Sequence, residues 1–142
     1  HTRCSRDWSS DVCSSDLFNV SAVHIVGKRD WNKRGAMVTD RYLTVIHHPT
    51  VTEFAQWAKE NEIPIIGIDN LPGSQHLEGA TLPEACVLFF GQEGAGMSDE
   101  AIAACSVLYE IEQYGSTRSM NASAAAAIAM YHWALQHLPR KL

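Results

Sequence analysis

Short apolar runs recur along this chain and alternate with segments of helical character. Runs of consecutive Val, Ile, Leu and Phe residues are typical of strands that are buried on both faces of a sheet. We expect strands at 21–27, 41–48, 63–68, 85–90 and 107–111. Strands that alternate with helices predict an α/β fold, in which a parallel sheet carries helices on both faces.

The segments between and after these strands carry helix signals. Thr50 and Glu53 form a capping-box pattern, and the residues that follow Thr50 place apolar side chains on one helical face. Ser98 is an N-cap followed by two acidic residues, which favour the positive end of a helix. The Ala-rich stretch 121–136 predicts another helix, because alanine has the highest helix propensity. The stretch 70–84 contains Gly and Pro and is typical of a loop.

Composition excludes several classes of protein. The 142 residues suffice for one domain, and no apolar stretch approaches the length of a membrane span. A net charge of −5 excludes a uniformly basic nucleic-acid-binding surface. The four cysteines include no C-x-x-C pair, so we expect no metal site, and we interpret Cys86 and Cys105 as buried thiols of a cytoplasmic protein. We favour a plain surface or strand-end pair for His47 and His48 over a metal or acid–base site.

Residues 1–17 differ in character from the rest of the chain. They contain a Ser-rich near-repeat and show no apolar periodicity. The segment resembles the translation of sequencing-adapter DNA, and a Ser-rich disordered tail is the alternative. We therefore divide the chain into a non-native or disordered segment, 1–17, and a domain, 18–142.

In a parallel α/β sheet, ligands bind beyond the carboxyl ends of the strands. One such end carries Gly91, Gly94 and Gly96 with Glu93 between them, ahead of a helix. Glycines let the backbone approach a ligand closely, but the spacing is not G-x-G-x-x-G and no P-loop lysine follows. An acid among the glycines suits a cationic or hydroxyl-bearing ligand better than a phosphate. A tight strand-to-helix turn with no ligand is the alternative.

A second polar loop follows the last predicted strand, from 111 to 123. It contains Gly115 and opens an Ala-rich helix near Ser119 and Asn121. The small side chains of that helix allow backbones to pack at close range. An N-cap on an ordinary core helix is the alternative interpretation.

Together the two loops resemble motifs 2 and 3 of the SpoU (TrmH-type) RNA 2′-O-methyltransferases of the SPOUT superfamily. Residues 91–98 match the family's second motif, G-x-E-G-x-G-[LM]-S, throughout. The third motif, I-P-x-x-G-x-x-x-S-L-N-x-S-x-A, is matched from Ile111 onward, except that Glu112 replaces the usual Pro and Met120 the usual Leu. The resemblance extends over about 18–138.

The resemblance implies a C-terminal deep trefoil knot that binds S-adenosylmethionine (SAM), and a homodimer whose subunits complete the active sites. Carried over residue by residue, it implies cofactor binding by Ile68, Asp69, Gly91, Gly94, Ile111, Gln113, Ser119 and Met120. Glu93, Ser119 and Asn121 match residues of the catalytic site that hold the catalytic arginine and the ribose.

The implied reaction moves a methyl group from the sulfonium of SAM to a ribose 2′-hydroxyl of tRNA or rRNA. In the family an arginine of motif 1, N-x-G-x-x-x-R-x-A-x-x-F-G, removes the hydroxyl proton. With Phe18 at the Phe position of that motif, Cys13 stands in place of the arginine and Asp7 in place of the asparagine. We therefore expect this chain to be an impaired, N-terminally truncated methyltransferase.

A basic segment offers contacts to RNA. Its cations surround Trp31, whose ring is suited to stacking on a base. The candidate RNA-binding residues are Lys28, Arg29, Lys33 and Arg34, together with Arg118 in the third motif. A solvated loop is the alternative for 28–34. Two other functions stay open: a noncatalytic SAM- and RNA-binding module of the same fold, and a generic α/β nucleotide binder that prefers ATP or NAD.

Overall fold

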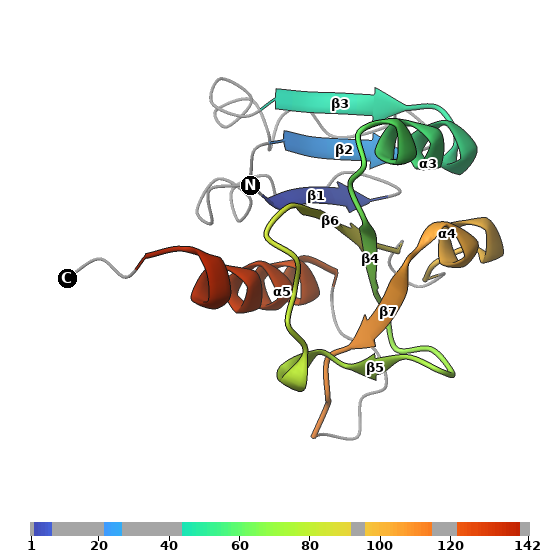
Figure 1. Ribbon diagram of the computed structural model, residues 1–142. Coiled ribbons are helices and arrows are strands. Elements are labelled where there is room, and N and C mark those ends of the chain that lie inside the picture. The colour runs from blue at the N-terminus through green and yellow to red at the C-terminus, as the bar shows by residue number, and fades with distance from the viewer. Residues whose placement is uncertain (1, 7–21, 27–43, 92–95, 115–121, 140–142) are drawn as a thin grey trace.

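The computed structural model of the protein describes residues 2–6, 22–26, 44–91, 96–114 and 122–139 (Figure 1). The strands are β1 (Thr2–Arg6), β2 (Ala22–Val26), β3 (Thr44–His48), β4 (Ile65–Ile68), β5 (Gln75–His76), β6 (Cys86–Phe90) and β7 (Val107–Glu110). The helices are α3 (Val51–Glu60), α4 (Asp99–Ala104) and α5 (Ala122–His137), with a 3₁₀ turn, η1 (Leu77–Gly79). All the strands and helices predicted from the sequence are present.

Within these described residues, the strands form one seven-stranded sheet in the order β3-β2-β1-β6-β4-β7-β5. Every neighbouring pair runs parallel. The predicted parallel α/β sheet is therefore confirmed. The sheet places the end of β4 between the ends of β6 and β7, so the first residues of the two candidate loops, Gly91 and Ile111, follow neighbouring strand ends.

The side chains of β6 alternate between two cores. Cys86, Leu88 and Phe90 pack in the core that α5 covers. Val87 and Phe89 pack in a second core, with residues of α3 and α4. Figure 1 shows the corresponding layers, with α5 on one side of the sheet and α3 and α4 on the other. Helices on both faces explain why β6 is apolar at every position.

Local signals in the sequence correctly located two helix starts. The Thr50 hydroxyl oxygen accepts a hydrogen bond from the Glu53 N–H at 3.1 Å, so Thr50 is the N-cap of α3. The Ser98 hydroxyl oxygen accepts one from the Ala101 N–H at 3.2 Å and caps α4. Each cap satisfies an N–H group that has no partner inside its helix.

One expectation about residues 1–17 needs correction. Thr2–Arg6 is not disordered: it forms β1, which lies between β2 and β6 in the middle of the sheet. A strand pairs through its backbone, so a polar run adopts this conformation when neighbours offer hydrogen bonds on both sides. The adapter origin of the segment and the domain boundary at residue 18 stay predictions. A smaller correction concerns 70–84, where β5 and η1 interrupt the predicted loop.

No helix in the described ranges combines the length and the apolar character needed to cross a membrane.

Candidate functional site

The carboxyl ends of β4, β6 and β7 meet at one edge of the sheet. Ile68, the last residue of β4, stands in register with Phe90 of β6 and with Tyr109 of β7. The next residue, Asp69, donates its backbone N–H to the Tyr109 carbonyl oxygen at 3.0 Å. Because parallel strands end at the same edge, Asp69, Gly91 and the residues after β7 lie where α/β sheets bind ligands.

At Gly91 the backbone passes very close to a later part of the same loop. A Cβ atom added there would lie 2.4 Å from the Gly96 carbonyl carbon and 2.5 Å from the Met97 nitrogen. Gly96 itself has a φ of +71°, a conformation that favours glycine. The requirement for glycine at these two positions is therefore steric as well as conformational.

Asp69 holds this glycine loop in place. One carboxylate oxygen accepts a hydrogen bond from the Met97 N–H at 3.1 Å, and the other accepts one from the Asn70 N–H at 2.9 Å. The first bond joins the end of β4 to the end of the loop that follows β6. In this arrangement Asp69 shapes the candidate site through backbone contacts, and its role in cofactor binding stays a prediction.

Other predicted cofactor-binding residues lie around the same edge. Ile68 is 5% exposed and belongs to the core under α5. Ile111 packs partly buried against that core. Gln113 is half-buried, and its neighbour Tyr114 is 89% exposed.

The remaining predicted site residues lie outside the described ranges. They are the cofactor candidates Gly94 and Met120, the catalytic candidates Glu93, Ser119 and Asn121, and the RNA-binding candidates Lys28, Arg29, Lys33, Arg34 and Arg118.

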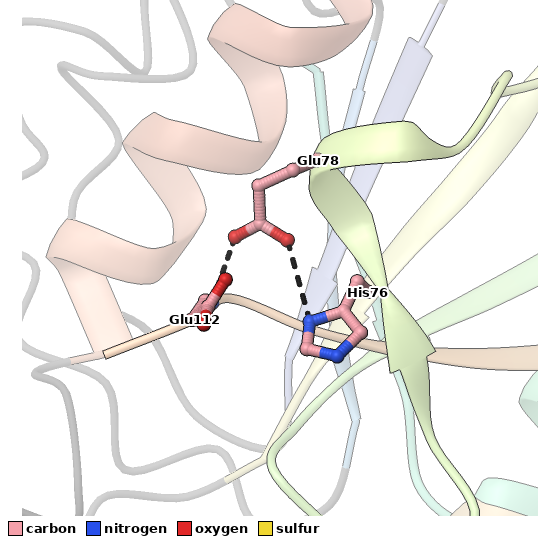
Figure 2. Close-up of side chains that lie close together, drawn as sticks. All are labelled: His76, Glu78 and Glu112. Atoms are coloured by element: carbon pink, nitrogen blue, oxygen red, sulfur yellow. Dashed lines mark hydrogen bonds and ion pairs between the residues drawn. The ribbon is translucent and has the colours of Figure 1, made fainter. Parts of the chain in front are cut away.

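A polar cluster beside this edge was not predicted from the sequence. Figure 2 shows His76, Glu78 and Glu112 together, and their ligand atoms lie within 4.8 Å of one another. The His76 ring stands 3.8 Å from carboxylate oxygens of both Glu78 and Glu110. All three members of the cluster are exposed. Exposed carboxylates often gather without an ion, and we assign no metal to this group.

Glu78 joins the other two members of the cluster, since it lies beside the His76 ring and contacts the Glu112 backbone. One of its carboxylate oxygens accepts a hydrogen bond from the Glu112 backbone N–H at 2.8 Å. Burial opposes the ionisation of Glu78, but this bond and one from its own backbone N–H lower its pKa below the usual value. The rings of His76 and His132 act in the same direction. No local sequence signal pairs residues 78 and 112. The sequence does show that Glu112 stands where the third motif has proline.

A buried histidine pair was also missed. His48 is 7% exposed and His24 is fully buried, and their ring nitrogens lie 2.9 Å apart. The predicted strand end is correct, since β3 ends at His48, but the predicted plain surface pair of His47 and His48 is wrong for His48. The aromatic rings of Trp57 and Phe54 lie against the pair, with ring centroids 4.4 Å from that of His24 and 5.3 Å from that of His48, respectively.

Of the two cysteines predicted to be buried, Cys86 is buried and Cys105 is partly buried. Burial raises the pKa of both Cys86 and Cys105 to about 12, so both side chains stay protonated at neutral pH.

The histidine pair predicts a loss of stability in mild acid. Burial, with a smaller effect of His47, lowers the pKa of His48, and Glu53 partly offsets both. The unfolded chain, with a His pKa of about 6.5, then binds more protons than the folded chain below that pH. The contribution of the pair to the free energy of unfolding is therefore fully present above the His pKa of the unfolded chain. It falls as the pH drops through that pKa toward the lower pKa of His48 in the folded chain.

Urea denaturation at a series of pH values between about 7.5 and 5, on both sides of the His pKa of the unfolded chain, measures the free energy of unfolding and so tests this expectation. The variant His48→Gln keeps a hydrogen-bonding side chain that does not titrate. It should lose part of the acid dependence of the free energy of unfolding. An unchanged dependence in the variant would contradict the assignment to this pair.

Comparisons with known proteins agree with the fold. Residues 12–131 match the SpoU rRNA Methylase family. A tRNA (guanosine(18)-2′-O)-methyltransferase of Borreliella burgdorferi is 27% identical over 130 residues, which cover 89% of this chain and 60% of that protein. The 23S rRNA (guanosine-2′-O-)-methyltransferase RlmB of Bordetella pertussis is 34% identical over 98 residues, covering 68% of this chain and 38% of that protein. The chain thus spans 60% or less of these relatives.

A solved structure shows the same fold. The SpoU methyltransferase AviRb from Streptomyces viridochromogenes, in complex with the cofactor AdoMet, superposes with a TM-score of 0.83 at 20% sequence identity. The superposition covers 96% of this chain and 57% of that one.

Proposed function

This chain belongs to the SpoU rRNA methylase family, and from that premise we propose that it transfers the methyl group of SAM to a ribose 2′-hydroxyl of tRNA or rRNA. One observation carries the proposal. The matched residues, 12–131, include both motif loops, and these loops leave strands that both pair with β4. Relatives named as tRNA and rRNA guanosine 2′-O-methyltransferases support the class of substrate.

The residues at the edge of β4, β6 and β7 fit a SAM molecule. Gly91 lets the loop after β6 fold back closely on itself, which brings the backbone of Gly96 and Met97 to the end of this strand. The carboxylates of Asp69, Glu110 and Glu112 make this edge acidic, which favours a cationic sulfonium over a phosphate. Bound SAM would supply the methyl group, and the protein would align it with the ribose oxygen.

The proposed site also includes residues outside the described ranges, which we assign from the motifs in the sequence. Gly94, Ser119 and Met120 would complete the cofactor pocket, and Glu93 and Asn121 would hold the ribose side of the reaction. The RNA would lie along Arg118 and the basic segment 28–34.

Three further properties follow from the family and stay proposals. The C-terminal segment would form the deep trefoil knot, and the chain would act in the cytoplasm, consistent with the protonated thiols of Cys86 and Cys105. Two copies would pair through α5, where Ile128, Tyr131 and Leu135 are exposed at helical spacing on one stripe. Sedimentation equilibrium tests the pairing.

A noncatalytic role is the second candidate, and a specific observation favours it. Asp7 and Cys13 stand where the family's motif 1 has its asparagine and its arginine. Without that arginine the 2′-hydroxyl lacks the group that removes its proton, so the chain would bind SAM and RNA but transfer the methyl group poorly.

Calorimetric titration and a transfer assay test these proposals on the whole chain. We expect SAM to bind, and ATP and NAD to bind far more weakly; preference for ATP or NAD would overturn the proposal. Transfer of labelled methyl from SAM to tRNA or rRNA should be slow in the chain as given. It should rise in the double variant Asp7→Asn, Cys13→Arg, which leaves β1 intact. Binding of SAM and RNA without any gain in transfer would favour the noncatalytic module.

A further inference from the structure

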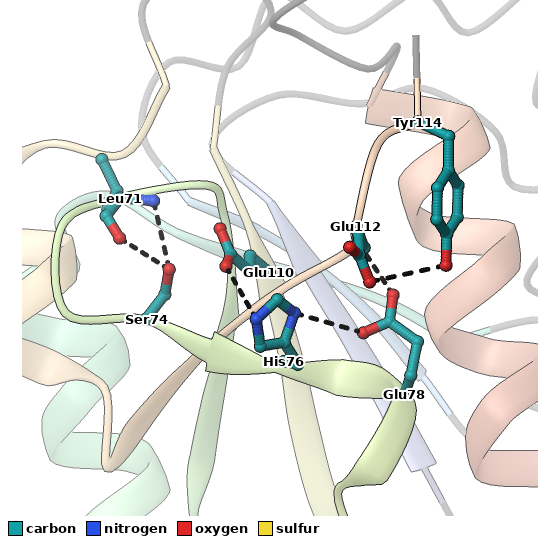
Figure 3. A network of polar contacts seen from close by, with 7 residues as sticks. All are labelled: Leu71, Ser74, His76, Glu78, Glu110, Glu112 and Tyr114. Atoms are coloured by element: carbon teal, nitrogen blue, oxygen red, sulfur yellow. Dashed lines mark hydrogen bonds and ion pairs between the residues drawn. The ribbon is translucent and has the colours of Figure 1, made fainter.

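The hydrogen bond between Glu78 and Glu112 fixes the start of the third-motif loop. Figure 3 shows Glu78 reaching across from η1 to the segment that continues β7. Its carboxylate oxygen accepts the Glu112 N–H at 2.8 Å, a contact between residues 34 apart in the chain. Glu112 lies between Ile111 and Gln113, both predicted cofactor-binding residues. A constraint on its backbone therefore acts on both neighbours.

The segment 75–84 that carries Glu78 is itself held firmly. On one side, β5 pairs with β7, with His76 in register with Glu110. On the other side, Gln136 of α5 makes two hydrogen bonds to the segment. Its amide nitrogen donates to the Ala80 carbonyl oxygen at 2.8 Å, and its amide oxygen accepts the Leu82 N–H at 2.8 Å. Glu78 thus extends from a rigid support.

The hydrogen bond between Glu78 and Glu112 replaces a backbone constraint that a proline usually supplies in the family motif. Glu112 stands where the family motif has proline, whose ring fixes φ and which has no N–H group to donate. The Glu112 backbone lacks that ring but has an N–H, and Glu78 accepts it. A hydrogen bond to a carboxylate is stronger than one between neutral groups.

We propose that Glu78 is a positioning residue, which orients the backbone at Glu112 and so sets the geometry of the cofactor site at Ile111 and Gln113. The part that concerns the cofactor rests on the proposed function. Glu78 acts as a hydrogen-bond acceptor, so the role should survive replacement by glutamine and be lost on replacement by alanine.

The experiment compares wild type, Glu78→Ala, Glu78→Gln and a control, Glu84→Ala, which removes an exposed acid of the same segment. Titration with SAM measures affinity, and thermal unfolding measures stability. Loss of the hydrogen bond that orients this backbone predicts a dissociation constant about five- to tenfold higher in Glu78→Ala. Glu78→Gln and Glu84→Ala should stay within about twofold of wild type. A lower melting temperature in Glu78→Ala with unchanged affinity would overturn the proposal.

A double-mutant cycle with Glu112→Pro isolates the bond. Proline removes the donor, so Glu78→Ala should have almost no further effect on SAM affinity in that background. An effect as large as in wild type would show that Glu78 acts by another route and would overturn the proposal.

Hydrogen exchange separates this inference from the proposed function. The Glu112 amide should exchange faster in Glu78→Ala than in wild type or Glu78→Gln, whether or not SAM is present. If wild type fails to bind SAM while exchange changes in this way, the cofactor role fails and the positioning role stands. Unchanged exchange in Glu78→Ala overturns the positioning role itself.

Discussion

Of all single substitutions that add one methyl group to the candidate site, Gly91→Ala should disrupt the site most. The new Cβ would lie 2.4 Å from the Gly96 carbonyl carbon and 2.8 Å from its oxygen. Both atoms belong to backbone, which cannot move aside as the end of a flexible side chain does. Relief requires a shift of the glycine loop, and that shift would break the bond between Asp69 and the Met97 N–H.

The expected result is a loss of on the order of 3 kcal/mol in the free energy of unfolding, at the upper end of the usual cost of overpacking. SAM binding should become too weak to titrate. Urea denaturation and calorimetry measure the two effects. Gly79→Ala is the matched control, because a Cβ at Gly79 meets nothing within 4 Å. Wild-type stability and affinity in Gly91→Ala would contradict the close approach.

The sequence predicted those features that depend on neighbouring residues. Thr50 and Ser98 cap their helices with bonds that span three residues, so their local patterns sufficed. The apolar run of β6 identified a central strand, since burial on both faces leaves little room for polar side chains. The glycine pattern likewise located a close turn, and the structure shows its steric basis at Gly91.

The features that were missed depend on contacts between distant residues. β1 is polar in sequence, and only its neighbours β2 and β6 make it a strand. His24 and His48 are 24 residues apart, and the local pattern suggested the wrong partner for His48. Asp69 was correctly placed at a strand end, but its bond to Met97 crosses 28 residues. Pairing of this kind is decided by topology, which no local pattern encodes.

Trp133 should be the most costly side chain to remove from the core under α5. It is 2% exposed and packs with Leu82 and Met130. Its indole N–H donates to the carbonyl oxygens of Pro83 and Glu84 at 3.1 and 3.2 Å. The side chain therefore contributes both apolar burial and a polar tie between α5 and the segment that leads into β6.

Trp133→Ala should lower the free energy of unfolding by about 3–5 kcal/mol, because it leaves a large cavity beside the sheet. Trp133→Phe keeps most of the ring but loses the donor, so it should cost about 1–3 kcal/mol. Tyr114→Ala, which removes an aromatic ring that is 89% exposed, should stay within about 0.5 kcal/mol of wild type.

Urea denaturation of the three variants orders these costs. The difference in free energy of unfolding between Trp133→Ala and Trp133→Phe measures the contribution of packing. The difference between Trp133→Phe and wild type measures the contribution of the hydrogen bonds together with that of the lost ring volume. Equal costs for Trp133→Ala and Trp133→Phe would mean that the polar tie dominates. In that case α5 would be held to the fold chiefly by its bonds to the segment 80–84, the same segment that supports Glu78.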